Sequence, residues 1–176
     1  MSTVRIWHLG DDVDTDQLAP GQYMKFDVAT IADHCLERSA PDFAREVRAG
    51  DIIVAGRNFG CGSSREQAPA ALKHLGVRAV VARSFAGLFY RNAFNLGLLL
   101  LQSADGERLL GAHDVVFDPG SGQISFDTSP ATMRQTISCE PVPDFLLEYV
   151  AVGGLLPYLK ARRSAANQLP VNTGKM

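Results

Sequence analysis

The feature that most constrains the fold is a glycine-rich loop, residues 56–66, between an apolar run and an alanine-rich run. The apolar run, residues 51–55, has the length and composition of a buried strand. Residues 67–75 are predicted to form a helix that ends at Gly76. A further apolar run at residues 78–82 completes a β–α–β unit of about thirty residues. Because such a unit pairs parallel strands, we expect a parallel sheet covered by helices.

The remaining patterns place further elements on both sides of this unit. Strands are predicted at residues 4–9, 98–101, 114–117, 123–126 and 133–139, and helices at residues 28–36, 41–47, 84–95, 143–149 and 154–162. Ser84 is expected to cap the helix that it begins. The pieces after residue 104 are short and include a turn at residues 118–122. We therefore expect an α/β domain over residues 1–163, with a parallel core and an antiparallel β section, and a flexible tail at residues 164–176.

Composition excludes several classes of protein. The chain is 46% hydrophobic and 20% charged with a formal net charge of −2, which gives no electrostatic basis for binding nucleic acid. No apolar run is long enough to span a bilayer, and the first residues lack a signal-peptide pattern, so we expect a cytoplasmic protein with no membrane partner. No metal site is predicted, because the four histidines are scattered and the cysteines are far apart, at Cys35, Cys61 and Cys139.

The glycine-rich loop ends in Ser63, Ser64, Arg65 and Glu66, just before the predicted helix. Free backbone N–H groups and the positive end of the helix dipole attract anions at such a position. An arginine can bind a carboxylate with two parallel hydrogen bonds. The loop is therefore predicted to hold an acid and to place a serine against it. The same four residues also fit a capping box, in which serine and glutamate satisfy the first N–H groups of the helix, and spacing alone leaves both interpretations open.

Four aspartates, Asp11, Asp12, Asp14 and Asp16, lie in the first long loop, residues 10–22. A calcium site is the first interpretation of such a cluster, but the EF-hand ligand spacing and its distal glutamate are lacking, and a solvated turn is the simpler, second interpretation. A third interpretation depends on the fold. If the first strand runs parallel to the strand before the glycine-rich loop, both loops emerge at the same edge of the sheet, where α/β proteins bind ligands. Residues 14–16 would then support Arg65 or Ser63.

Taken together, these motifs resemble those of a known family. The resemblance rests on residues 12–16 with Pro20 and Tyr23, and on residues 50–56, 58–66, 84–86 and 89–92. They are similar to the small subunits of 3-isopropylmalate dehydratase and homoaconitase, which are themselves similar to the mobile C-terminal domain of aconitase. The resemblance covers roughly residues 3–162 and implies a three-layer, swivelling β/β/α domain.

The resemblance also implies a function. It indicates a hydro-lyase of leucine biosynthesis that moves a hydroxyl group between adjacent carbons of a substituted malate. No cofactor is expected in this chain, because a separate large subunit would carry a [4Fe–4S] cluster and complete a heterodimer. By resemblance, Ser63 is the catalytic base, Ser64 and Arg65 bind a substrate carboxylate, and Asp14 and Thr15 line the site. The residues expected to support the loop are Gly60, Cys61, Gly62 and Glu66.

In the same family, the segment at residues 23–26 contacts the variable side group of the substrate. Lys25 would suit the extra carboxylate of the tricarboxylate homoaconitate, whereas Phe26 would suit an isopropyl group if Lys25 turned to solvent. We expect the dicarboxylate isopropylmalate. Homoaconitate, citraconate or citramalate, and a dimethylmalate are the alternative substrates, and a carboxylate-binding assembly module without chemistry is the alternative function.

Overall fold

The computed structural model describes residues 4–129 and 133–166, and these residues form two separate sheets. The parallel sheet has the strand order β1-β2-β3-β4, with the bounds Ile6–His8, Ile52–Ala55, Ala79–Ala82 and Leu99–Gln102. The antiparallel sheet has the order β5-β6-β7, with the bounds Asp114–Asp118, Gln123–Asp127 and Gln135–Ser138. The predicted parallel core and antiparallel section are therefore both confirmed.

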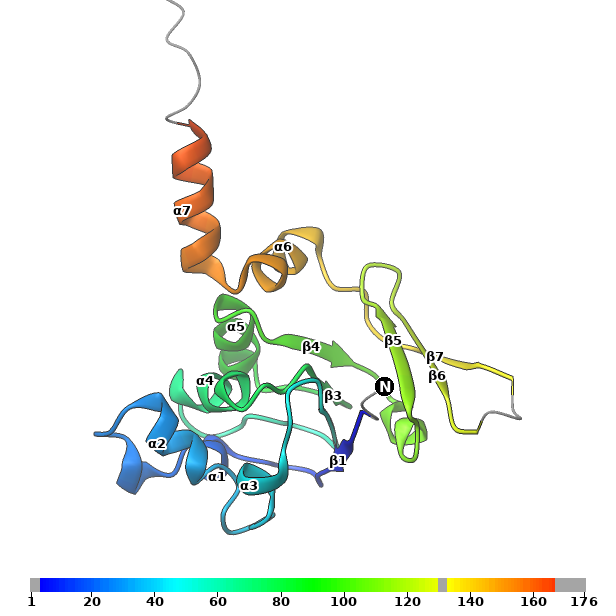
Figure 1. Cartoon of the computed structure of the whole chain (residues 1–176), viewed down its shortest axis with the longest axis horizontal. Helices are drawn as coiled ribbons and strands as arrows, with labels where there is room; N and C mark the ends of the chain where they lie inside the picture. The colour runs from blue at the N-terminus through cyan, green and yellow to red at the C-terminus, as the bar shows by residue number, and fades with distance from the viewer. Residues whose placement is uncertain (1–3, 130–132, 167–176) are drawn as a thin grey trace, which may run out of the picture.

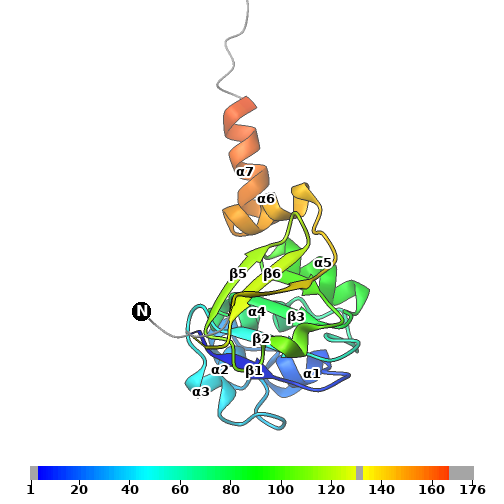
Figure 2. The ribbon, with the colours of Figure 1, turned by 90° about the vertical axis from the view of Figure 1, so that its right-hand side faces the viewer.

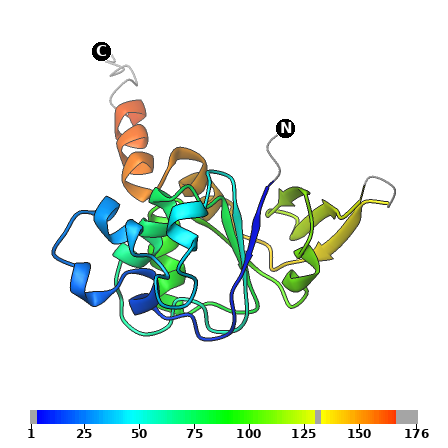
Figure 3. The same ribbon diagram turned by 60° about the horizontal axis from the view of Figure 1, so that its bottom comes forward.

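Helices cover one face of the parallel sheet, and the antiparallel sheet covers the other, which gives the expected three layers (Figures 1 and 3). The α-helices are α1 (Thr15–Leu18), α2 (Val28–Asp33), α3 (Phe43–Glu46), α4 (Gln67–His74), α5 (Gly87–Asn95), α6 (Asp144–Val152) and α7 (Leu155–Ala166). Two 3-10 turns, η1 (Gly21–Tyr23) and η2 (Gly106–Leu109), complete the set. Within the described ranges, no helix is both long enough and apolar enough to cross a membrane.

The central strands are buried on both faces because they lie between two layers. Every residue of β2 and β3 is buried. Their sequences are therefore continuously apolar and rich in isoleucine, valine and alanine rather than alternating. The largest fully buried side chains include Phe94 and Phe59, which pack with these strands in one continuous core.

The strand register places the two polar loops at one edge of the sheet. Strand β1 pairs in parallel with β2, with Ile6 opposite Ile52. Both strands therefore point the same way, and the aspartate loop after β1 emerges beside the glycine-rich loop after β2. One isolated parallel bridge, between Asp14 and Cys61, continues this pairing beyond the strands. The conditional expectation that the two loops meet is confirmed.

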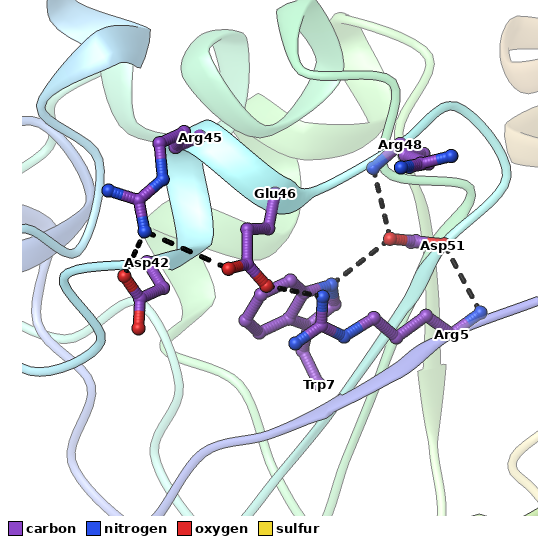
Figure 4. A network of polar contacts seen from close by, with 7 residues as sticks. All are labelled: Arg5, Trp7, Asp42, Arg45, Glu46, Arg48 and Asp51. Atoms are coloured by element: carbon purple, nitrogen blue, oxygen red, sulfur yellow. Dashed lines mark hydrogen bonds and ion pairs between the residues drawn. The ribbon is translucent and has the colours of Figure 1, made fainter.

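A second polar cluster lies at the opposite, amino end of β1 and β2 (Figure 4). The Asp51 carboxylate accepts hydrogen bonds from the backbone N–H of Arg5 (3.2 Å), the indole Nε1 of Trp7 (3.1 Å) and the backbone N–H of Arg48 (3.0 Å). Arg5 also pairs with Glu46 at 2.7 Å. The Asp51 residue is only 4% exposed. This cluster therefore fastens the edge strand β1 to the start of β2.

Two local expectations need correction. Ser84 does not cap α5, because the helix begins at Gly87 and the Ser84 hydroxyl oxygen instead accepts the backbone N–H of Asn58 at 2.8 Å. Ser84 is used for a contact with the glycine-rich loop rather than for its own helix. Helix α7 continues to Ala166, three residues beyond the expected end of the domain, and residues 167–176 of the predicted tail lie outside the described residues.

Candidate active site

The glycine-rich loop is held in shape by the segment that follows β1. Gly60 has a φ of 79° and lies so close to Phe89 that a β-carbon would overlap the phenyl ring, so only glycine fits there. The Gly60 N–H donates to the carbonyl of Val13 at 2.7 Å, and the Thr15 N–H donates to the carbonyl of Cys61 at 2.8 Å. These backbone bonds fix the position of the next residues, which carry the chemistry.

Ser63 lies against the hydroxyl group of Thr15. The backbone N–H of Ser63 donates to Thr15 Oγ1 at 3.0 Å, and the two hydroxyl oxygens are 3.1 Å apart. Thr15 is only 2% exposed, and its hydroxyl proton has no other acceptor in the described part of the chain. Because a buried donor needs a partner, Thr15 donates to Ser63 Oγ. The Ser63 hydroxyl proton is then free to point toward solvent, since Ser63 itself is exposed.

Arg65 is anchored by Asp16 and keeps one edge of its guanidinium group open. Its Nη1 donates to Asp16 Oδ1 at 2.6 Å and to the carbonyl of Ala19 at 3.0 Å. The Arg65 hydrogen bond lowers the pKa of Asp16 below its usual value, helped by the backbone N–H of Gly21. The Nε and Nη2 groups of Arg65 contact no acceptor among the described residues. That edge has the geometry of a fork for a carboxylate.

The capping-box interpretation is wrong. Helix α4 begins at Gln67, its capping position is Glu66, and no side chain makes a cap hydrogen bond there. The Ser63 hydroxyl bonds instead to Thr15, and the Ser64 carbonyl accepts the side-chain amide of Asn92 at 3.1 Å. The backbone N–H groups of residues 64–66 find no acceptor in the described ranges, so they are available to an anion beside the helix N-terminus.

Other predicted site residues have different surroundings. Asp14 is the N-cap of α1, because its Oδ1 accepts the backbone N–H of Gln17 at 2.8 Å. The Cys61 thiol has its pKa raised, first by burial and then by the negative charge of Asp14. It therefore stays protonated and neutral, and it packs in the loop rather than acting as a nucleophile. Glu66 is exposed at the start of α4.

Lys25 and Phe26 lie on the turn after η1, which is fixed at its base. The Tyr23 ring stacks on His34 with the ring centres 3.6 Å apart. Phe26 is 49% exposed, and Lys25 Nζ lies 5.3 Å from the centre of the Phe26 ring. The turn therefore presents both a cation and an aromatic ring to solvent. It begins at Gly21, whose N–H bonds to the same Asp16 oxygen that holds Arg65.

Sequence reasoning left two contributors out of the set of site residues. Asp16 positions Arg65, and Asn92 of α5 positions Ser64. The conditional expectation that the aspartate loop supports Arg65 is confirmed at Asp16, although Asp16 was not among the predicted site residues, and Asn92 was visible only as part of the family motif at residues 89–92. The interpretation of the cluster as a calcium site gains no support, because the described residues contain no group of three or more His, Cys, Asp or Glu side chains placed to hold a metal.

Comparison with known proteins agrees with this arrangement. Residues 17–106, which include Ser63, Arg65 and Asn92, match the family described as Aconitase C-terminal domain. The chain belongs to this family. The matched range begins just after Thr15 and Asp16, the residues that complete the site from the neighbouring loop.

Relatives of this aconitase-domain chain extend the match to most of its length. It is 46% identical over 159 residues to the 3-isopropylmalate dehydratase small subunit of Syntrophus aciditrophicus, covering 89% of this chain and 94% of the relative. It is 48% identical over 159 residues to the methanogen homoaconitase small subunit of Methanothermobacter thermautotrophicus, covering 89% of each. The crystal structure of 3-isopropylmalate dehydratase from Methanocaldococcus jannaschii matches with a TM-score of 0.83 and 40% identity, over 96% of this chain and 98% of that one.

Proposed function

We propose that this chain is the small subunit of a hydro-lyase of the 3-isopropylmalate dehydratase type. The enzyme would interconvert 2-isopropylmalate and 3-isopropylmalate by reversible loss and return of water, a step of leucine biosynthesis. The names of the relatives support this class of reaction. The observation that carries the proposal is the exposed Ser63 hydroxyl, whose oxygen lies 3.1 Å from that of the buried Thr15 hydroxyl, beside the open edge of Arg65.

Ser63 is the proposed base. In the dehydration direction, the bond between hydrogen and the carbon next to a carboxylate breaks, and the proton goes to Ser63 Oγ. The electron pair that is left forms a carbon–carbon double bond as the hydroxyl group leaves the adjacent carbon. A serine alkoxide is a strong base that needs stabilisation to form near neutral pH. The Thr15 hydroxyl donates to that oxygen, and the free N–H groups at the start of α4 add positive potential.

Arg65 is proposed to orient the substrate. Its Nε and Nη2 edge would bind one substrate carboxylate with two parallel hydrogen bonds, while Asp16 keeps Nη1 and the plane of the guanidinium fixed. The Ser64 hydroxyl, placed by the Asn92 contact to the Ser64 carbonyl, would bind the same carboxylate. Holding the substrate in this way aligns the carbon to be deprotonated with Ser63.

The reaction also requires a partner. The proton donor to the leaving hydroxyl is assigned to a large subunit, because the resemblance to this family implies it and the relatives are named small subunits. A [4Fe–4S] cluster in that subunit would supply a Lewis acid for the hydroxyl and carboxylate groups of the substrate. The described part of the small subunit offers no cluster ligands of its own. The relatives are named small subunits, and the assembly is accordingly proposed as a hetero-oligomer.

Homoaconitate is the second candidate substrate, since one relative is named a homoaconitase small subunit and Lys25 is exposed on the turn after η1. A lysine there would pair with the extra carboxylate as a point charge. Isopropylmalate would instead contact the exposed Phe26 ring. Sequence identities of 46% and 48% to the two kinds of relative do not separate the alternatives.

The test is hydro-lyase activity of this chain mixed anaerobically with its cluster-bearing large subunit, with isopropylmalate and homoaconitate assayed in parallel. Turnover of isopropylmalate, unchanged in Lys25→Val, is the expected result. If the wild-type complex turned over homoaconitate and the Lys25→Val variant did so more slowly, homoaconitate would be the substrate. If the assembled complex turned over neither compound nor any other substituted malate, while the isolated chain bound dicarboxylates tightly, the chain would be a binding module.

A further inference from the structure

An apolar groove begins beside the catalytic loop and runs along the outer side of α4. It has a volume of about 650 Å³ and is walled by the start of α2, by α4, by the end of α5 and by the first turn of α7. Its apolar lining includes Val28, Ala70, Leu96 and Leu156, and Glu66 lies at the end nearest Ser63. An adjoining hollow of about 250 Å³ shares Val28, Glu66, Ala70 and Leu96. We refer to the two together as the α4 groove.

The α7 wall of this groove is fixed by the tight turn at Gly153 and Gly154 that joins α6 to α7. We refer to this turn as the elbow. The backbone of Gly97 lies against Gly153 and Gly154 so closely that a β-carbon on Gly97 or Gly154 would overlap backbone atoms. Lys73 of α4 donates to the carbonyl of Gly153 at 2.6 Å and also to the carbonyl of Leu96. Lysine at the ends of α5 and α6 is favourable because both helix C-termini carry partial negative charge. The elbow therefore sets the direction in which α7 leaves the domain.

Helix α7 itself stands away from the rest of the domain (Figures 1 and 2). Leu156 is 69% exposed and Leu159, three residues on along the same side, is 50% exposed. The helix also carries Lys160, Arg162 and Arg163 and contains no acidic residue. A helix that is held in a defined direction yet leaves leucines in water is expected to bury them against another molecule.

The position of the groove beside the glycine-rich loop is the basis for choosing an occupant. Glu66 lines both parts of the α4 groove and lies three residues from Ser63. Leu88 of α5 is 48% exposed and lies one turn before Asn92, which holds the Ser64 carbonyl. The groove and the first turn of α5 therefore both adjoin the segment that carries the exposed serines. A protein that covers Ser63 to complete the reaction must also cover the near end of the groove.

We propose that the α4 groove and the exposed side of α7 bind the large subunit, an inference that rests on the proposed function. The partner surface would present an apolar ridge that fills the groove. Acidic side chains beside the ridge would face Lys160 and Arg163, because α7 is uniformly basic. The elbow at Gly153 and Gly154 would then set how the large subunit is oriented over Ser63. A groove of this kind, with a polar rim around apolar anchors, is typical of a specific interface.

The test compares Leu156→Glu with Val116→Glu, measuring the dissociation constant for the cluster-bearing large subunit and the turnover of the complex. Val116 is the matched control, because it is an exposed apolar residue (48%) on the antiparallel sheet, away from the groove. Leu156→Glu is expected to weaken binding at least tenfold, and Val116→Glu to leave it within twofold. Turnover in Leu156→Glu should recover at saturating large subunit, since its catalytic loop is unchanged. Arg163→Glu should weaken binding less, and its effect should shrink at high salt.

The outcomes separate this inference from the proposed function. Unchanged affinity of Leu156→Glu in a catalytically active complex would overturn the docking surface and leave the function standing. Loss of self-association of the isolated chain in Leu156→Glu, with large-subunit binding intact, would also overturn it and assign the groove to a second copy. If the wild-type chain neither bound a large subunit nor supported turnover, the proposed function would fail and the docking inference with it. Circular dichroism of each variant checks that the chain is folded.

Discussion

At the amino end of the β1–β2 pair, the Asp51 carboxylate is almost completely buried and accepts hydrogen bonds from two backbone N–H groups and an indole. At the carboxyl end of the same pair, Ser63 and Arg65 are held just as closely. There, however, Nε and Nη2 of Arg65 and the backbone N–H groups of residues 64–66 have no acceptor among the described residues. The first cluster is closed and serves the fold. The second is preorganised but incomplete, so it serves a ligand. The difference shows that unused hydrogen-bonding capacity, rather than the number of polar residues, distinguishes the candidate site.

The change with the largest expected effect is Ser63→Ala, which removes the proposed base from the open cluster. The turnover number of the assembled enzyme should fall by about 10³-fold or more, the range for loss of a general base. The free energy of unfolding should fall by no more than about 1–3 kcal/mol, the cost of leaving the buried Thr15 hydroxyl without its acceptor. Steady-state kinetics with the large subunit and urea denaturation of the isolated chain measure the two effects. Retained turnover would remove Ser63 from its role.

The next largest effect is expected for Arg65→Lys. A lysine keeps the charge and can still pair with Asp16, but it lacks the fork that holds a carboxylate. The specificity constant should fall by about 10²-fold, with most of the loss in transition-state binding. Kinetics on the reconstituted complex check this. An Arg65→Lys enzyme with wild-type kinetics would mean that the open edge of the guanidinium does not bind substrate.

Asp51→Asn tests the closed cluster. An amide accepts fewer hydrogen bonds than a carboxylate, so the donors of Arg5, Trp7 and Arg48 would not all be satisfied. The free energy of unfolding should therefore fall by about 1–3 kcal/mol. Turnover at 25 °C should stay at the wild-type level. The matched control is Asp11→Asn, since Asp11 also accepts a backbone N–H, from Arg57, but is exposed, and its effect on stability should be smaller. A large loss of turnover in Asp51→Asn would contradict the conclusion that the Asp51 cluster serves only the fold.

The smallest of the four effects is expected for Thr15→Val, which keeps the shape of the side chain and removes the hydroxyl group. The turnover number should fall by about tenfold, the value of one hydrogen bond to a developing charge. The pH at which turnover reaches its maximum should rise, because Ser63 loses the donor that stabilises its alkoxide. Thr15→Ser should restore both. A purely structural role for Thr15 would lower stability without moving the pH profile.

Much of this arrangement could be predicted from the sequence because it depends on backbone patterns. The apolar runs before the two loops predicted β1 and β2, and parallel pairing alone then brought Thr15 and Asp16 to the glycine-rich loop. The turn at residues 118–122 likewise predicted the antiparallel section.

The errors came from polar side chains that have more than one good partner. Ser63 has the spacing of a capping residue, yet it bonds to Thr15, 48 residues earlier in the chain. Ser84 has the sequence position of a cap, yet it accepts from Asn58. Local spacing gives the partners that are near along the chain, and tertiary contacts decide among those and the distant ones. The roles of Asp16 and Asn92 depend entirely on such distant contacts.

The edge position of β1 has a consequence for the behaviour of the protein on heating. This strand is only three residues long and pairs with one neighbour, so its detachment is a small local opening that leaves β2, β3 and β4 together. Its detachment would loosen the segment that holds Thr15 and Asp16 against the glycine-rich loop. Catalytic activity should therefore be lost at a lower temperature than secondary structure. The Asp51 carboxylate, which fastens the other end of β1, sets the difference between these two temperatures.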